Sequence, residues 1–522
     1  MKSIYKSSLF ITALLTVVLF TGCNKYLDVN TDPNRATDAN MTADLIFPNA
    51  AVEVAALQAN AYWSTTSNNF ASNNLVFLNR WMGYWGWPGD YAVDQEETSY
   101  NINFSSSDGI WSRYYNTLFD LHQVQVKATA KGDSVLAGTS IILSAKLWQE
   151  LVDVFGDIPY SQTFQSDLYQ SPIYDKGTDV YAALQTNLDN AIVLVGKTAK
   201  KTFPTTDIVF NGDANKWKKF ANTLKLRILL RQAETTYKSA APTAELAKIA
   251  ANGGILGSGE PVNVNPGFTN SAGKQSPFYA AYGKTATNAD ASSTTRANNF
   301  FVTLLANNSD PRNVYFFRTV GGNVVGTTYG LPQGNPLGSA SSQAGPGVAK
   351  DPAQAAWILP AFESMFFHAE AVARGWMSDK IDSVAYRDAV KESFVWLMTP
   401  NLTATQATQA ATDYLASADI ARWSANAGST VQSKVNFILT QKYISLCSVD
   451  ALEAWSDYRK MNKTTIPATV TAGNGDSFTL LSVNPARGAN TIPLRMLYPQ
   501  SEYTANPNTP TTAARIFWIP QY

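Results

Sequence analysis

The chain has 522 residues, with 40 basic and 40 acidic side chains and no formal net charge, and only 15% of its residues are charged. Since 45% of the residues are apolar and 12% are aromatic, the chain can bury a large core, which excludes an intrinsically disordered protein. The neutral balance argues against nucleic acid, whose binding depends on phosphate neutralisation by Lys and Arg. Two His and two Cys are too few for a Cys/His zinc site or a disulfide framework, so neither a metal nor a cofactor is predicted.

The first segment has the composition of a secretory signal. Two lysines precede the apolar run Leu9–Phe20, which is shorter than the about 20 residues that span a bilayer. The run ends in Phe20-Thr21-Gly22-Cys23, which resembles the lipobox of bacterial lipoproteins, where cleavage precedes a cysteine that carries diacylglycerol. We therefore predict a lipoprotein signal peptide at residues 1–22, a lipidated Cys23 and a flexible tether over residues 23–40. The alternatives are an ordinary signal peptide with a chance cysteine, or an N-terminal membrane anchor.

Helical periodicity dominates the rest of the chain, where apolar residues recur at three- and four-residue spacing. In the first of the predicted helices, Asp108 is expected to be the N-cap and Gly132 to end the helix. The pattern predicts a mainly α fold, with a single domain over residues 41–522 on a tetratricopeptide-like helical-repeat scaffold of about four helix pairs. The predicted pairs are Asp108–Lys131 with Val135–Phe155, Asp179–Val195 with Asn215–Tyr237, Gln354–Trp376 with Ser383–Met398, and Ser433–Leu446 with Asp450–Met461.

Long irregular loop inserts separate these pairs. The largest are Asn252–Asn298 and Gly321–Pro352, followed by the tail Thr464–Tyr522, and all three are rich in turn-forming residues. Their aromatic residues predict ordered packing on the helices: Phe268, Phe278, Tyr279, Tyr282 and Tyr329. Cys447 lies in an apolar run, and a buried, unreactive thiol is expected there.

Several segments, in this order, resemble signatures of the SusD/RagB family of outer-membrane nutrient-binding lipoproteins, in particular its SusD-like second branch. The best-known branch carries a Glu where Gln441 stands here, and Arg-Arg or Arg-Trp where Arg459-Lys460 stands. Within these segments we expect Trp217, Phe220 and Trp455 in the core, and Asp310, Arg312 and Glu370 as helix caps or charge pairs. The segments are Leu151–Ser161, Trp217–Arg227, Ser309–Arg312, Ala369–Gly375, Thr440–Ile444, Glu453–Arg459 and Tyr498–Glu502.

The resemblance implies a surface-exposed lipoprotein of the outer membrane that binds an oligomeric nutrient, in the first instance a glycan. It further implies a SusC-like TonB-dependent transporter as partner, over which the protein acts as a hinged lid, and no enzymatic activity. A peptide-binding importer subunit of the same architecture is the alternative. A lipid-anchored glycoside hydrolase and a purely structural envelope protein are further hypotheses.

A loop dense in aromatic residues, Arg80–Tyr91, contains the candidate binding residues. Its glycines break helical order, so its rings are expected on a loop, where an exposed indole can stack on the apolar face of a sugar. The alternative interpretation is that the rings anchor the loop on the helices, since large aromatic side chains are mostly buried. The candidates are Trp81, Tyr84, Trp85, Trp87, Asp90 and Tyr91, with Asn73 and Asn74 as hydrogen-bonding partners.

No catalytic residue is predicted. Both histidines, His122 and His368, fall within helical patterns and have no Ser or Cys candidate nearby in sequence, so each is interpreted as a core or helix-face residue. Carboxylates near the aromatic loop, such as Asp94 and Glu97, keep glycoside hydrolysis open as the weaker hypothesis.

Overall fold

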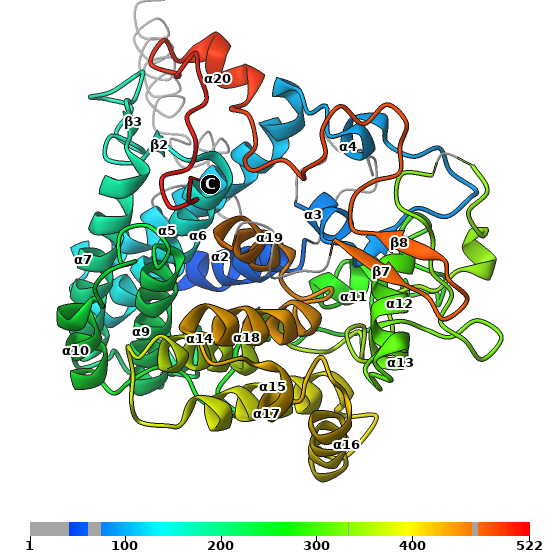
Figure 1. Cartoon of the computed structure of the whole chain (residues 1–522). Helices are drawn as coiled ribbons and strands as arrows, with labels where there is room; N and C mark the ends of the chain where they lie inside the picture. Colours follow the sequence, from blue (N-terminus) through cyan, green and yellow to red (C-terminus); the bar gives the residue numbers. More distant parts are fainter. Residues whose placement is uncertain (1–40, 61–74, 332, 462–467, 522) are drawn as a thin grey trace, which may run out of the picture. The chain divides into compact units, whose positions relative to one another are not determined.

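The helices begin and end largely where the apolar periodicity predicts. The structure is a computed structural model that describes residues 41–60, 75–331, 333–461 and 468–521 (Figure 1). The long helices are α2 (Ala43–Gln58), α5 (Asp108–Ala130), α6 (Ser134–Phe155), α7 (Gly177–Val195), α9 (Ala214–Arg231), α14 (Ala361–Ala373), α15 (Asp382–Met398), α16 (Ala404–Ser417), α18 (Val431–Ser445) and α19 (Ala451–Lys460). The prediction of a mainly α, tetratricopeptide-like scaffold is confirmed.

Short helices and strands make up the rest. The short helices are α3 (Phe77–Trp81), α4 (Gln95–Ser99), α8 (Phe203–Thr206), α10 (Thr243–Ala251), α11 (Pro277–Tyr282), α12 (Asn299–Asn307), α13 (Asn313–Phe316), α17 (Trp423–Asn426) and α20 (Gln500–Ala505), with the 3-10 turns η1 (Phe104–Ser107) and η2 (Gly338–Ala340). The strands form four antiparallel pairs: β1 (Trp85–Gly86) with β5 (Arg296–Ala297), β2 (Ile158–Pro159) with β3 (Tyr174–Asp175), β4 (Val262–Val264) with β6 (Ala356–Leu359), and β7 (Thr469–Thr471) with β8 (Ser477–Thr479).

Local side chains account for several helix boundaries. Asp133 caps α6 by accepting a hydrogen bond from the Leu136 backbone N–H at 3.1 Å. Asp108 is the first residue of α5 and not its N-cap, and its carboxylate accepts instead from the Ser501 hydroxyl at 2.6 Å. The helix predicted from Gln354 starts later because residues 356–359 form β6.

The helices pack in chain order over much of the scaffold. α5 packs on α6, α6 on α7 and α7 on α9, while α14 packs on α15 and α15 on α16. The fourth predicted pair differs, since α18 packs mainly on α14 and α15, and α19 packs on α3. In Figure 1 the blue helix α2 runs through the middle of this scaffold, and it contacts α5, α6 and β6.

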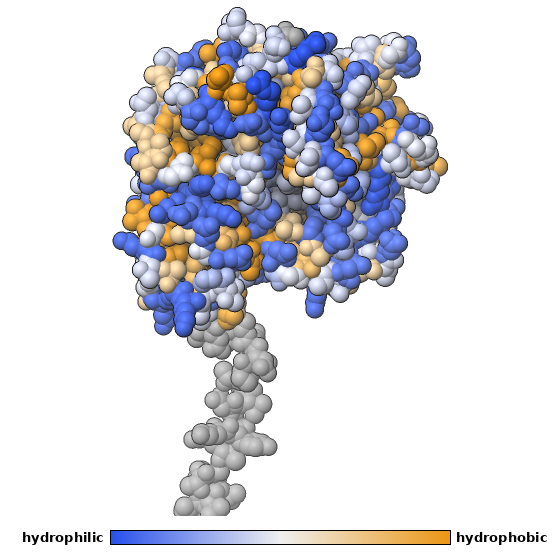
Figure 2. All heavy atoms as spheres, turned by 90° about the horizontal axis from the view of Figure 1, so that it is seen from below, coloured by the Kyte–Doolittle hydropathy of each residue, from blue (hydrophilic) through white to orange (hydrophobic). Residues whose placement is uncertain are grey.

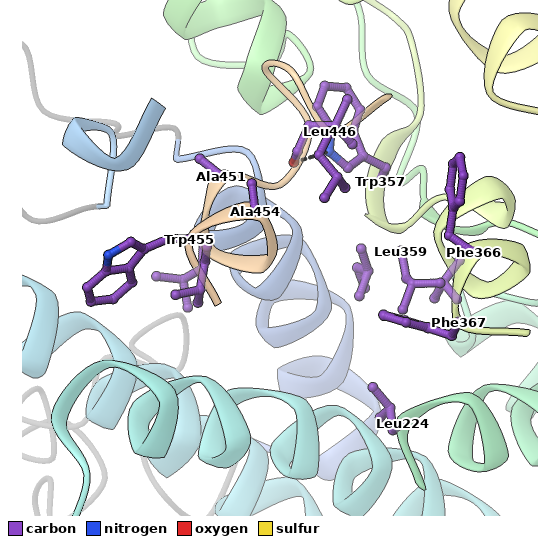
Figure 3. Close-up of a cluster of buried hydrophobic side chains, with 14 of the residues drawn as sticks. Leu224, Trp357, Leu359, Phe366, Phe367, Leu446, Ala451, Ala454 and Trp455 are labelled. Atoms are coloured by element: carbon purple, nitrogen blue, oxygen red, sulfur yellow. Dashed lines mark hydrogen bonds between the residues drawn. The ribbon is translucent and has the colours of Figure 1, made fainter. Parts of the chain in front are cut away.

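One contiguous core lies between these helices. Figure 3 shows Trp357, Phe366 and Phe367 among its members, and the Trp357 indole N–H donates to the Val449 carbonyl at 3.2 Å. Trp217, Phe220 and Trp455 are fully buried, as predicted. The apolar helix α6 is also long enough to cross a membrane, but 89% of its apolar window is buried, which is typical of a core helix.

The long inserts are ordered and tied to the scaffold, as their aromatic residues predict. Phe278 lies 4.9 Å from Trp357 between ring centroids, and the Tyr282 hydroxyl donates to the Asn60 carbonyl at 2.5 Å. The tail reaches the second insert at Gly330, where a Cβ would lie 2.0 Å from the Ser482 hydroxyl oxygen, so only glycine fits. Cys447 is buried, as predicted, and burial raises the pKa of its thiol, which is typical of an unreactive cysteine.

Candidate functional site

The rings of the aromatic loop lie in the core, which contradicts the expectation that they are exposed on a loop. The side chains of Trp81, Tyr84, Trp85 and Trp87 are between 0 and 5% exposed. The Tyr84 hydroxyl donates to the Tyr443 carbonyl near the end of α18 at 2.6 Å, and the Trp85 indole donates to the Ser448 hydroxyl in the turn before α19 at 2.8 Å. The rings therefore anchor the loop on the helices, as the alternative interpretation had it, and no ring face is free for a ligand.

The polar end of the loop is at the surface. Tyr91 is 42% exposed, and Asp90 is exposed and accepts a hydrogen bond from the Gly338 backbone N–H. Both stay candidates. Asn73, Asn74 and Cys23 lie outside the described residues, as do the predicted signal peptide and the predicted tether.

A large cavity lies elsewhere, on the helical scaffold. Its volume is about 1040 Å³, and its walls come from α10, α14, α15, α16 and the segments 254–258 and 376–380. Figure 2 views the molecule from the side on which α15 and α16 lie in Figure 1, and apolar side chains gather there in patches among polar ones. The apolar part of the wall consists of Leu246, Ile249, Ile255, Leu256, Met365, Trp376, Met377 and Val395.

Trp376 is the aromatic side chain of this cavity, and the end of α14 positions it. Gly375 has a φ of +72°, which ends the helix in the left-handed region and turns the chain. The backbone N–H of Trp376 then donates to the Ala371 carbonyl at 2.8 Å. Tyr237 holds the indole edge to face with centroids 6.0 Å apart, which leaves Trp376 half-buried at the wall.

Paired charges form the polar part of the wall. The imidazole of His368 lies 2.9 Å from the Asp379 carboxylate. Burial raises the pKa of Asp379, but the hydrogen bond and charge of His368 outweigh it and hold that pKa below its ordinary value. On α15, the Glu392 carboxylate accepts from the Ser258 hydroxyl at 2.6 Å and from the Gly259 backbone N–H at 3.1 Å.

This arrangement is suited to binding. A half-buried indole beside carboxylates, an imidazole and hydroxyls can stack on an apolar ligand face while the polar groups bond to hydroxyl or amide groups. Within the described ranges, no group of three or more His, Cys, Asp or Glu side chains is placed to hold a metal ion. Sequence reasoning placed His368 on a helix face but missed the cavity, because its walls come from segments spread between residues 246 and 408.

A helical-repeat scaffold with a deep cavity of mixed polarity defines a ligand-binding protein. The sequence model of the second SusD-like family, described as "Starch-binding associating with outer membrane", matches residues 48–499. The chain therefore belongs to the SusD/RagB family of nutrient-binding outer-membrane proteins. No curated protein matches the chain.

Solved structures show the same fold. A SusD homologue from Bacteroides fragilis is 18% identical with a TM-score of 0.69, covering 90% of this chain and 94% of that one. A SusD/RagB family protein from Bacteroides thetaiotaomicron is 19% identical with a TM-score of 0.68, over 90% and 95% of the two chains. A chitin-binding SusD homologue from Flavobacterium johnsoniae is 20% identical with a TM-score of 0.68, over 91% and 99%.

Proposed function

We propose that this chain is a lipid-anchored, surface-exposed protein that binds a glycan at the outer membrane and delivers it to a SusC-like TonB-dependent transporter. In this role it acts as a hinged lid and catalyses no reaction. The family description, which names starch, and the similarity in fold to chitin-binding proteins support a glycan as ligand. The flexible leader predicted before residue 41 supports the lid, since a tether keeps the body near the membrane while it moves.

The observation that carries the glycan proposal is the cavity at Trp376. Ligand pockets measure roughly 300–1,000 Å³, and this cavity of about 1040 Å³ is large enough for an oligomer. Its indole offers a surface for one sugar ring, and Glu392, Ser258 and the His368–Asp379 pair offer hydrogen-bond partners for hydroxyl groups.

A peptide ligand is the second candidate, and two features of the same cavity favour it. Met365 and Met377 line the wall, and methionine side chains adapt to varied apolar groups. Charged side chains of both signs also line the wall, such as Lys380 and Asp388, which form an ion pair at 2.6 Å. Such side chains suit a peptide, which carries both positive and negative groups.

Replacing Trp376 by Ala is expected to weaken oligosaccharide binding about tenfold, because a stacking surface is lost. The measurement is calorimetric titration of the intact protein with maltohexaose and chitohexaose, and with a tryptic casein digest as the peptide probe. Trp423→Ala is the matched control, since Trp423 is also half-buried but packs on Tyr386 and Phe437 outside the cavity.

If Trp376→Ala binds the oligosaccharides as tightly as the unaltered protein does, the cavity at Trp376 is not the glycan site. Binding of the digest alone would favour the peptide alternative. Chromatography of the titrated oligosaccharides tests for catalysis, and shortened products would overturn the assignment as a binding protein.

Replacing Cys23 by Ala is expected to move the protein from the membrane fraction to the soluble fraction, because the acylated thiol is the predicted anchor. Cell fractionation and immunoblotting measure this. Cys447→Ala is the control, since that thiol is buried and is expected to leave membrane association unchanged. Retention of Cys23→Ala in the membrane fraction would contradict a lipid anchor.

A further inference from the structure

A second hollow lies between α5, α6 and α7, beneath the loop that follows β2. Its volume is about 390 Å³, and its lining residues belong to none of the segments around the larger cavity. At the small end of the roughly 300–1,000 Å³ range of ligand pockets, this hollow has room for a small molecule or for one part of a larger one.

Aromatic rings form one side of the hollow. Trp148 lies edge to face with Tyr160, with centroids 5.0 Å apart and planes at 84°. Phe164 is 6.2 Å from Trp148 and 5.3 Å from the ring of His122. Tyr160, Phe164 and His122 are half-buried, so part of their surface is open beside the hollow that they line. Flat rings of this kind offer apolar faces to a ligand.

The other side is polar but carries no formal charge. Gln125 and Asn187 contribute amides, and the only ionisable lining groups are His122 and Tyr160. Burial lowers the pKa of His122 and raises the pKa of Tyr160, so it favours the uncharged form of both side chains. The larger cavity, in contrast, is lined by charged side chains of both signs.

This wall contains an unsatisfied hydrogen-bonding group. Asn187 donates to the Tyr160 hydroxyl at 2.8 Å, which orients the amide within the hollow. The Thr163 hydroxyl oxygen is buried and has no hydrogen-bond partner among the described residues. Since an unsatisfied buried hydroxyl costs free energy, a ligand with its own hydroxyl or amide groups would be stabilised here.

Phe164 sits at the hollow in an unusual conformation. Its φ of +63° is in the left-handed region, which a bulky side chain rarely adopts because its Cβ crowds the following carbonyl. Glycine adopts the same conformation without this cost. Phe164 therefore occupies this position despite a backbone conformation that favours glycine. Its ring contacts Trp148 and His122 there.

We propose that this hollow is a second carbohydrate site, which takes one uncharged sugar ring of the ligand. The sugar stacks on the exposed part of Phe164, which packs against the buried Trp148. Its hydroxyl groups bond to Gln125, Asn187 and Thr163. A neutral polyol fits because it leaves no charge to be desolvated in a wall without counter-charges. The inference rests on the proposed glycan-binding function and adds a site to it.

The test compares Phe164→Gly and Gln125→Leu with the unaltered full-length protein in calorimetric titrations with maltohexaose and chitohexaose. Phe164→Gly removes the ring and relieves the backbone, so we expect a melting temperature at or above that of the unaltered protein and an affinity about tenfold weaker. Gln125→Leu removes a hydrogen-bonding amide on the half-buried face of α5, and an affinity about fivefold weaker is expected.

Two controls match these variants. Tyr169→Ala removes an exposed ring further along the same loop, and Gln123→Leu alters a half-buried glutamine on α5 that does not line the hollow. Both are expected to bind as the unaltered protein does. If Phe164→Gly lowers the melting temperature, a loss of affinity in that variant could come from unfolding. The affinity of Gln125→Leu then decides whether the hollow binds the ligand.

The outcomes separate this inference from the proposed function. Unchanged affinity in Phe164→Gly and Gln125→Leu, with weaker binding in Trp376→Ala, overturns the second site and leaves the glycan function standing. Failure of the unaltered protein to bind either oligosaccharide overturns both. Weaker binding in the hollow variants, with the controls unchanged, supports the second site.

Discussion

Glu453→Gln is expected to lower the free energy of unfolding by about 3–5 kcal/mol, since it leaves buried cations without their shared counter-charge. The Glu453 carboxylate accepts from Arg231 at 2.5 Å, from Arg227 at 3.0 Å and from Lys442 at 2.6 Å, and it is about 1% exposed. Burial alone raises the pKa of Glu453, but these cations outweigh it and hold the pKa well below its ordinary value. Urea unfolding followed by far-ultraviolet circular dichroism measures the change.

Asp167→Asn is the control for this variant, because it also removes one carboxylate charge but at an exposed position. It is expected to shift the free energy of unfolding by less than about 0.5 kcal/mol. A loss in Glu453→Gln as small as in the control would show that neighbouring carboxylates, Asp153 beside Arg231 and Glu150 beside Arg227, are sufficient to neutralise the two arginines.

The helical scaffold was predictable because each helix carries its own pattern. In α5 the buried residues Trp111, Leu118 and Leu121 recur at helical spacing while the opposite face is polar, so the local sequence identifies the element. α2 was missed for the opposite reason. It is mostly apolar and has a proline at position 48, so it presents no distinct polar face and contains a residue that is unfavourable inside a helix. It is held by contacts with α5 and β6.

The placement of the candidate site was not predictable from local sequence. The glycines around Trp85 indicate a loop, but whether the ring is exposed depends on Ser448, which is 363 residues away in the chain. The same limit applies to the larger cavity. Trp376 is the last residue of a predicted helix, but Ser258 and Glu392 line the same cavity only through tertiary packing, such as that of α14 on α15. At Phe164 the left-handed φ leaves no trace in the sequence.

The structure also explains the Gln at position 441, where the best-known branch of the family carries Glu. The Gln441 side-chain oxygen accepts from Arg312 at 2.9 Å, while its amide N–H groups donate to the Tyr414 hydroxyl and the Ile420 carbonyl, each at 3.1 Å. A carboxylate has no N–H to donate. A carboxylate at position 441 would also be a second buried anion beside Asp310. Arg312 already forms an ion pair with Asp310 at 2.6 Å. The amide therefore suits a site with one cation and one anion.

Arg312→Met is accordingly expected to lower the free energy of unfolding by about 3–5 kcal/mol, because it leaves the buried Asp310 carboxylate without its cation. Arg312 donates to Asp310 through Nε at 3.0 Å and Nη2 at 2.6 Å, and its guanidinium lies 4.6 Å from the centre of the Phe394 ring. Arg312→Lys keeps the charge but loses this forked and stacked geometry, so an intermediate loss is expected in the same urea titration.

The double variant Asp310→Asn with Arg312→Met distinguishes a buried charge pair from simple loss of packing. If the cost of Arg312→Met comes from the stranded carboxylate, neutralising Asp310 should recover part of the stability, and the two substitutions should be non-additive. Additive losses would mean that the guanidinium stabilises the fold through Phe394, Tyr414 and Gln441 instead, and that the pairing with Asp310 contributes little.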